Sequence, residues 1–139
     1  MVEELLSYSQ QDLSDLNELM HELSASSYWD DSLLRNAMSD QNTHVYVIRD
    51  GGHIVGTATL CMMHSLEFTK ASIESVVVSS LYRGKGYGRM LMDFILSDAN
   101  KLEIHHLHLT SNPKRIAANE MYRKIGFQKY ETNCYKIEI

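Results

Sequence analysis

Three glycines within five residues separate an apolar run from an amphipathic segment, and this arrangement constrains the fold more than any other feature of the chain. The apolar run ends in three valines at Val78, and Gly84, Gly86 and Gly88 follow. Apolar side chains then recur at helical spacing, at Tyr87, Met90, Leu91, Phe94 and Ile95. We therefore expect a strand, a glycine turn (residues 83–88) and a helix that packs one face on a sheet.

The glycine turn is typical of a site for a ligand that carries phosphates. Backbone N–H groups at the start of a helix have no partner within the helix, and the helix dipole adds positive potential there. A plain tight turn is the ordinary alternative for a lone glycine cluster. A nucleoside triphosphatase loop is disfavoured because Arg89, five positions after Gly84, stands where such a loop needs its second glycine, and no Lys followed by Ser or Thr comes after it. The dinucleotide fingerprint also fails, because it needs its third glycine one place after Gly88.

The rest of the chain predicts an α+β fold, in which a mixed sheet carries helices on its faces. Before the glycine turn we expect two helices, one from Ser9 to about Ser24 that begins with a capping box of Ser9 and Asp12, and one from Asp31 to Met38. We also expect three strands there, at His44–Arg49, His53–Met63 and Ala71–Val78. After it we expect a strand at Ile104–Thr110, a helix with Asn112 as N-cap and Pro113 as its first residue that ends at Gly126, and a hairpin over Phe127–Ile139.

Length and composition predict one ordinary globular domain over residues 1–139. The formal net charge of −5 argues against a nucleic-acid partner, whose binding surface should be basic. We find neither a membrane-spanning run nor a signal peptide, and we expect no membrane association and a cytoplasmic protein. Cys61 and Cys134 lie in apolar, strand-like runs, so we expect two reduced thiols in the core.

Taken together, these motifs resemble the GNAT superfamily of acetyl-CoA-dependent N-acetyltransferases. The glycine turn, Arg83-Gly84-Lys85-Gly86-Tyr87-Gly88, resembles that family's Arg/Gln-x-x-Gly-x-Gly/Ala pyrophosphate loop. Val76-Val77-Val78 resembles the family's strand before that loop. Leu109–Pro113, Ala118–Tyr122 and Gly126-Phe127 resemble its later strand, its helix and its Tyr-x-x-x-Gly-Phe ending. The resemblance covers about Thr43 to Ile139 and only in outline the first 40 residues. It implies a central, mostly antiparallel, twisted sheet with helices on both faces.

The resemblance implies acetyl-CoA as the cosubstrate. Backbone amides of the glycine turn would bind its diphosphate, and the strand Val76 to Val78 would pair with the pantetheine arm and polarise the thioester carbonyl through one N–H group. The full set of implied contacts is Val76, Val77, Val78, Arg83, Gly84, Lys85, Gly86, Tyr87, Gly88, Arg89, Asn112 and Asn119. A solvated basic turn and a buried strand are the ordinary alternatives, and N-capping alone explains Asn112.

Two further residues have implied roles in the chemistry. Tyr122 stands where many family members keep a tyrosine that protonates the departing thiolate, although an amphipathic core tyrosine is the alternative. Glu74 is the candidate base for the attacking amine. The alternative is that Glu74 is an ordinary surface or salt-bridged carboxylate. Strict alternation puts Glu74 on the face of Val76 and Val78, and a bulge would change that face.

The expected activity is transfer of an acetyl group to a primary amine by direct attack, on a small-molecule or peptide substrate. The alternative is a non-catalytic sensor or interaction module that binds acyl-CoA. We expect no metal, because His106 and His108 share a strand face without a visible third and fourth ligand.

Two segments of the chain are candidates for contact with other molecules. The segment Ser24–Asp31, which contains Tyr28 and Trp29, is either a substrate lid or a capped helix junction anchored by the tryptophan. An apolar strand at Tyr135–Ile139 would pair two copies as a homodimer if its edge is exposed.

Overall fold

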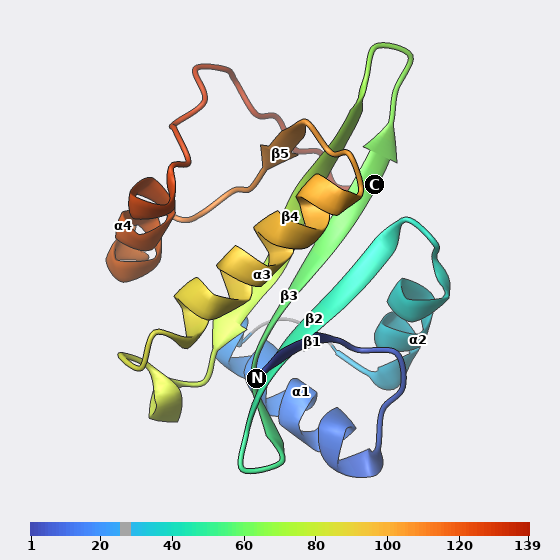
Figure 1. Cartoon of the computed structure of the whole chain (residues 1–139), viewed down its shortest axis with the longest axis vertical. Helices are drawn as coiled ribbons and strands as arrows, with labels where there is room; N and C mark the ends of the chain where they lie inside the picture. Colours follow the sequence, from blue (N-terminus) through green and yellow to red (C-terminus); the bar gives the residue numbers. More distant parts are fainter. Residues whose placement is uncertain (26–28) are drawn as a thin grey trace.

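The computed structural model describes residues 1–25 and 29–139 (Figure 1). Its elements are β1 (Val2–Glu4), α1 (Gln10–Leu23), α2 (Asp31–Ser39), β2 (Thr43–Asp50), β3 (His53–His64), β4 (Thr69–Val78), the 3-10 turn η1 (Ser80–Tyr82), α3 (Tyr87–Lys101), β5 (His106–His108) and α4 (Ile116–Ile125). Within these ranges the strands form one sheet in the order β1-β2-β3-β4-β5. All neighbours are antiparallel except β4 and β5, which are parallel. The mixed, mostly antiparallel sheet is as predicted.

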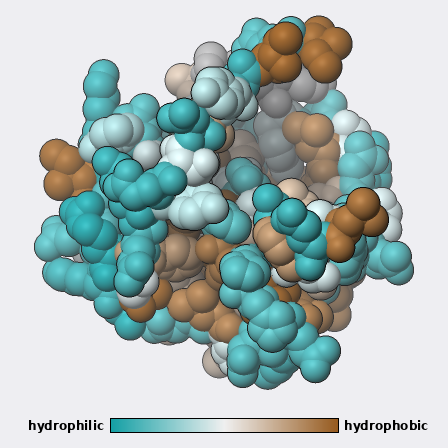
Figure 2. Space-filling model, turned by 90° about the horizontal axis from the view of Figure 1, so that it is seen from above, coloured by the Kyte–Doolittle hydropathy of each residue, from teal (hydrophilic) through white to brown (hydrophobic). Residues whose placement is uncertain are grey.

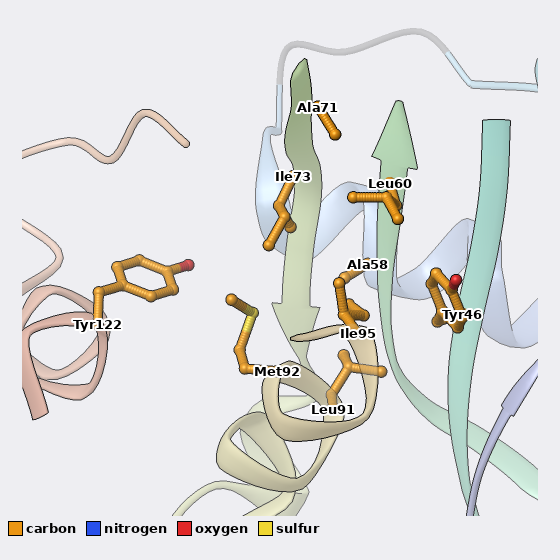
Figure 3. Close-up of a cluster of buried hydrophobic side chains, with 9 residues drawn as sticks. All are labelled: Tyr46, Ala58, Leu60, Ala71, Ile73, Leu91, Met92, Ile95 and Tyr122. Atoms are coloured by element: carbon orange, nitrogen blue, oxygen red, sulfur yellow. The ribbon is translucent and has the colours of Figure 1, made fainter. Parts of the chain in front are cut away.

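Helices cover both faces of this sheet, and each face has its own apolar core. The first core lies between the sheet, α3 and α4 and consists of Tyr46, Ala58, Leu60, Ala71, Ile73, Leu91, Met92, Ile95 and Tyr122 (Figure 3). The second core lies between the sheet, α1 and α2 and consists of Leu5, Leu16, Leu19, Leu34, Val45, Val47, Ile54 and Val77. Burial of these side chains is the main source of the fold's stability.

Strand β4 carries a bulge that changes which residues face each core. Thr59 of β3 lies opposite Glu74, and Thr57 lies opposite Val77. Ser75 and Val76 of β4 therefore both lie opposite the one β3 residue between them. Ser75 takes a φ of 54° at this point. Val76 packs against the first core, whereas Val77 belongs to the second. The bulge therefore ends the strict alternation on which the expected face of Glu74 depended.

The helices and strands before the glycine turn lie close to the ranges predicted from the sequence. Ser9 accepts a hydrogen bond from the Asp12 amide at 3.1 Å, and Asp12 accepts one from the Ser9 amide at 2.9 Å, which confirms the capping box. Asp30 caps α2, and Trp29 packs against the second core, which favours the helix-junction interpretation of this segment. Tyr28 lies outside the described residues. Strand β1 was not predicted, since three residues with two carboxylates give no local strand signal.

Two elements after α3 were predicted with the wrong extent, and Asn112 is not the N-cap of α4. The strand expected at 104–110 is limited to β5, because only Lys70–Ser72 of β4 pairs with it. The helix expected from Pro113 begins at Ile116. Asn112 instead closes a turn, in which its side chain accepts a hydrogen bond from the Lys114 amide and its carbonyl accepts one from the Arg115 amide.

The C-terminal hairpin expected over Phe127–Ile139 was also wrong, since no strand is assigned there. Its last residues alternate between apolar and polar side chains but pair with no strand, and Ile137 and Ile139 are exposed. Cys134 is exposed rather than a core thiol, whereas Cys61 is partly buried. The edge expected to join two copies is therefore not formed.

The surface mixes hydrophilic side chains with separate apolar ones (Figure 2). Exposed apolar side chains include Leu66 at the β3–β4 turn, Leu81 in η1 and Ile116 at the start of α4. None of the described helices has the length and apolar character needed to cross a membrane.

Candidate active site

A pocket of about 590 Å³ lies where the end of β4, the glycine turn, the start of α3 and helix α4 meet. Most of the residues expected to bind the cosubstrate line it, namely Val76, Val77, Val78, Arg83, Gly84, Gly86, Tyr87, Gly88 and Arg89. Tyr122 lines it from the α4 side. Segments more than forty residues apart in the chain thus converge on one pocket, with polar and apolar walls.

The glycine turn leaves the N-terminus of α3 open to a ligand. Gly84 and Gly86 both have a φ of about +80°, a conformation that favours glycine. Gly86 is the N-cap of α3, and no side chain makes a capping hydrogen bond there. A Cβ atom at either glycine would meet no heavy atom within 4 Å, so the space beside the turn is open. This arrangement fits a diphosphate, whose oxygens accept hydrogen bonds from the free amides.

Basic side chains surround the turn, and neighbouring groups hold each of them. Arg83 donates from Nε to the Val78 carbonyl at 3.3 Å. Lys85 lies over the Tyr82 ring, with its Nζ 5.0 Å from the ring centroid, although Lys85 is not among the lining residues. Arg89 donates to Asp93 at 2.9 Å. Basic side chains therefore lie beside the turn, with Arg89 paired to Asp93 and Arg83 paired to Glu22.

Tyr87 contributes to the wall of the pocket by its position at the start of α3. Its hydroxyl donates a hydrogen bond to Asp50 on β2, which ties the first turn of the helix to the sheet. This hydrogen bond raises the pKa of Tyr87 above its ordinary value. Tyr87 is therefore a structural anchor of the pocket rather than a free donor.

The edge of β4 that faces the pocket carries unpaired backbone groups. Strand β5 pairs only with Lys70–Ser72, so β4 beyond Ser72 has no strand partner on this side within the described residues. Arg115 donates from Nη2 to the Val76 carbonyl at 3.2 Å. The Val76 carbonyl therefore faces this open edge.

Tyr122 is the buried phenol of the pocket. Its side chain is 5% exposed, and its ring makes an edge contact with Phe127 at 6.0 Å between centroids. Its hydroxyl points toward β4 (Figure 3) and, among the described residues, makes no hydrogen bond. Burial raises the pKa of Tyr122, an effect that the charge of Arg115 partly opposes. The phenol is therefore protonated at neutral pH and has a proton to donate.

Besides Lys85, three predicted residues lie outside the pocket lining, namely Glu74, Asn112 and Asn119. Glu74 is exposed and accepts a hydrogen bond from the Ser72 hydroxyl at 3.0 Å. The bulge places it on the face opposite Val76, which corrects the face expected from strict alternation. Asn119 donates from Nδ2 to the carbonyls of Asn112 and Arg115, both at 2.9 Å. The two asparagines thus fix the turn before α4 instead of lining the pocket.

Arg115 is the main residue that the sequence did not reveal. It is the N-cap of α4, lines the pocket and contacts the β4 edge. Placing the helix start at Pro113 put Arg115 inside the first helical turn and hid this role. Tyr82 was missed as well, since its only signal was an aromatic residue just before the glycine turn.

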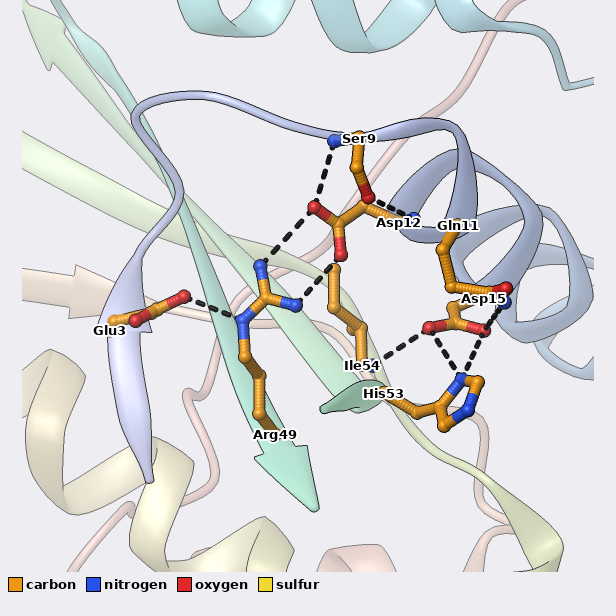
Figure 4. A network of polar contacts seen from close by, with 8 residues as sticks. All are labelled: Glu3, Ser9, Gln11, Asp12, Asp15, Arg49, His53 and Ile54. Carbon is orange, nitrogen blue, oxygen red and sulfur yellow. Dashed lines mark hydrogen bonds and ion pairs between the residues drawn. The ribbon is translucent and has the colours of Figure 1, made fainter. Parts of the chain in front are cut away.

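A second polar cluster lies away from the pocket and ties α1 to the sheet (Figure 4). Arg49 donates to Asp12 at 2.7 Å and to Glu3 at 2.7 Å. Asp15 accepts hydrogen bonds from the Ile54 amide at 2.9 Å and from Gln11 at 2.9 Å. Within residues 1–25 and 29–139, no group of three or more His, Cys, Asp or Glu side chains is arranged to hold a metal ion.

Comparisons with known proteins point to one family. The model of the acetyltransferase (GNAT) family matches residues 9–127. The chain is 25% identical over 101 residues to the N-alpha-acetyltransferase RimI of Mycobacterium tuberculosis, which covers 73% of this chain and 62% of that protein. The chain thus spans less than two thirds of that relative.

Solved structures share the whole fold at low sequence identity. A putative acetyltransferase from Agrobacterium tumefaciens is 23% identical with a TM-score of 0.86, over 99% of both chains. A ribosomal-protein-alanine N-acetyltransferase from Brucella melitensis is 17% identical with a TM-score of 0.80, over 100% of this chain and 98% of that one. The glucosamine-6-phosphate N-acetyltransferase of Arabidopsis thaliana is 19% identical with a TM-score of 0.78, over 99% and 97%.

Proposed function

Because the chain belongs to the acetyltransferase (GNAT) family, we propose that it transfers the acetyl group of acetyl-CoA to a primary amine. The observation that carries this proposal is the convergence of three parts on one pocket. These parts are the uncapped N-terminus of α3, the open edge of β4 and the buried phenol of Tyr122. Each part meets one need of acetyl transfer, namely to hold the diphosphate, to align the thioester and to protonate the leaving group.

Acetyl-CoA fits the donors that the pocket offers. The amides of the glycine turn and the α3 dipole would bind the diphosphate, and Arg83 and Arg89 would add charge-assisted hydrogen bonds. The open edge of β4 would pair with the amide groups of the pantetheine arm, as a further strand pairs with a sheet edge. A backbone amide of the strand Val76 to Val78 would donate to the thioester carbonyl and stabilise the negative charge that develops on its oxygen.

In the proposed reaction, the substrate amine attacks the acetyl carbon directly. A carbon–nitrogen bond forms, the carbon–sulfur bond breaks, and Tyr122 donates its proton to the departing sulfur. The protonated amine first gives one proton, through water, to Glu74 on the α1 face of the sheet. After the attack its nitrogen gives a second proton to the Tyr122 phenolate, which restores the phenol. No acyl-enzyme forms, and the chemistry uses no metal ion.

The acceptor is proposed to be a small-molecule or peptide amine. The names of two similar proteins refer to N-alpha acetylation and to a ribosomal protein alanine, and the name of a third refers to glucosamine 6-phosphate. Both classes present a primary amine, which is mostly protonated at neutral pH. The exposed carboxylate of Glu74 would attract that cation before it loses its proton.

Thiol release from acetyl-CoA tests this function across an amine panel. The panel holds peptides with free N-terminal amines, glucosamine 6-phosphate and a polyamine, with acetyl-CoA alone as the blank. We expect thiol release with at least one amine, matched by the mass of the acetylated product. Binding of acetyl-CoA without release for any amine would instead favour the acyl-CoA-binding module.

A further inference from the structure

Glu22, near the end of α1, makes three contacts with the segment that joins β4 to the glycine turn. Its Oε2 accepts a hydrogen bond from the Ser80 amide at 2.9 Å, and its Oε1 accepts one from the Ser80 hydroxyl at 3.3 Å. The same carboxylate pairs with Arg83 Nη2 at 3.5 Å. One side chain therefore holds both ends of η1.

This segment has few other contacts that would fix its position. None of the residues of η1 is buried, and Gly84, Lys85 and Gly86 are exposed. Among the described residues, its other hydrogen bonds to the sheet run from the Ser79 amide to the Val55 carbonyl at 2.8 Å and from Arg83 Nε to the Val78 carbonyl at 3.3 Å. A segment with little buried apolar surface opens locally at a low free-energy cost unless polar contacts hold it. The contacts of Glu22 are thus a large share of what positions it.

We infer that Glu22 is a positioning residue that holds η1, and through it the glycine turn, in the conformation that binds the diphosphate of acetyl-CoA. This inference rests on the proposed function, because it presumes that the turn binds acetyl-CoA. The hydrogen bond from the Ser80 amide carries the effect, and it reduces the conformational freedom that binding would otherwise have to remove. Glu22 itself lies outside the pocket lining; of the two residues it contacts here, Arg83 lines the pocket and Ser80 belongs to η1.

The direction in which the Kd for acetyl-CoA changes when Glu22 is removed distinguishes a positioning role from simple electrostatic repulsion. Acetyl-CoA is an anion, so removing any nearby carboxylate should strengthen its binding through reduced repulsion. Loss of the anchor should weaken binding instead. Glu18 gives a matched control, because it is an exposed glutamate one turn earlier on the same helix. Gln at position 22 removes the charge but keeps an oxygen that accepts from the Ser80 amide.

The test is calorimetric titration of the purified protein and its variants with acetyl-CoA. We expect Glu22→Ala to raise the Kd about five-fold, Glu18→Ala to leave it unchanged or lower it, and Glu22→Gln to stay within about two-fold of the wild type. Equal affinities of Glu22→Ala and Glu18→Ala would overturn the inference. A Glu22→Gln protein that binds as weakly as Glu22→Ala would also overturn it, because the effect would then need the charge.

Hydrogen exchange without ligand separates this inference from the proposed function. The amides of residues 79–83 should exchange faster in Glu22→Ala than in Glu18→Ala, with equal melting temperatures for the two variants. Equal exchange rates would contradict the anchoring role even if acetyl-CoA binds. A wild-type protein that does not bind acetyl-CoA would contradict the proposed function, whatever the exchange rates show.

Discussion

Ile73 and Val77 lie four residues apart on β4, yet Ile73 packs in the core under α3 and Val77 packs in the core under α1 and α2. In a regular strand both would face the same side, since side chains alternate with a period of two. The bulge at Ser75 accounts for the difference. It also interrupts the strand at the point where the pocket begins, so a local backbone irregularity directs Val76 toward the first core beside the pocket.

The bulge predicts opposite effects of glycine at two serines of β4. Ser75 has a φ of 54°, so Ser75→Gly should relieve strain and raise the free energy of unfolding by about 0.5–1 kcal/mol. Ser72→Gly, at a position with ordinary strand geometry, should lower it by about 1 kcal/mol. Urea denaturation measures both. A loss of stability in both variants would show that the positive φ of Ser75 is not strained.

A pair of glycine variants separates backbone strain from ligand binding. Gly86 and Gly52 have φ values of +80° and +84°, and a Cβ atom at either meets nothing within 4 Å. Ala at either position should therefore cost a similar amount of stability, about 1 kcal/mol. Only Gly86→Ala should weaken acetyl-CoA binding, by about tenfold, because relaxation of the turn moves the amides that bind the diphosphate. Equal affinity in the two variants would remove the glycine turn from the binding site.

Much of the fold could be predicted because its signals are local. Ser9 and Asp12 are three residues apart and form the capping box, and the spacing of Leu91 and Ile95 identified α3. The α4 start was misplaced because Asn112 and Pro113 form a turn that precedes the helix, and such turns share residue preferences with helix N-termini.

The remaining features depend on contacts between distant segments. The alternating residues at Tyr135–Ile139 suit a strand, but pairing needs a free partner edge that no local pattern reports. The contacts of Glu22 and Arg115 join residues 58 and 39 positions apart in sequence, so no spacing rule indicates them. The binding loop was therefore predictable, whereas the residues that position it were not.

Removing the Tyr122 hydroxyl should affect catalysis more than binding or folding. In Tyr122→Phe we expect the acetyl-transfer rate to fall by about 10²- to 10⁴-fold, with the Kd for acetyl-CoA within about two-fold of the wild type. Burial raises the pKa of Tyr122 above its ordinary 10.0, so the wild-type rate should not fall through loss of this acid below about pH 10. Steady-state kinetics with the identified amine measures both.

Tyr46 provides the control for that substitution. It is also a buried tyrosine, and its hydroxyl donates to Asp98 at 3.0 Å outside the pocket lining. Tyr46→Phe should lower the free energy of unfolding by about 1–2 kcal/mol and leave the transfer rate unchanged. An unaltered rate in Tyr122→Phe would exclude the phenol as the proton donor.

The pairing of Asp12 with Arg49 predicts a stability that depends on pH. The hydrogen bond from Arg49 is the main cause that lowers the pKa of Asp12 below its ordinary 3.8. A lowered folded-state pKa stabilises the fold above the unfolded-state pKa, and this contribution is lost as the pH falls through the folded value. Asp12→Asn should therefore lower the free energy of unfolding by about 2 kcal/mol at neutral pH, and the difference should shrink below about pH 4.

Glu3 is the comparison for Asp12, because it contacts the same guanidinium from a side chain that is 47% exposed. Solvent screening should limit the loss in Glu3→Gln to about 0.5 kcal/mol. Denaturation of both variants across the pH range measures the two contributions. A constant difference between Asp12→Asn and the wild type at every pH would rule out the ionised pair as its source.

Calorimetric titration of the wild-type protein with acetyl-CoA, CoA, ATP and NAD in one buffer tests the central claim most directly. The open β4 edge fits the pantetheine arm, and the turn of residues 83–88 fits a diphosphate, so the account predicts binding of acetyl-CoA and CoA and much weaker binding of ATP and NAD. Binding of neither CoA compound, or equal binding of ATP, would contradict the assignment of this pocket to acetyl-CoA.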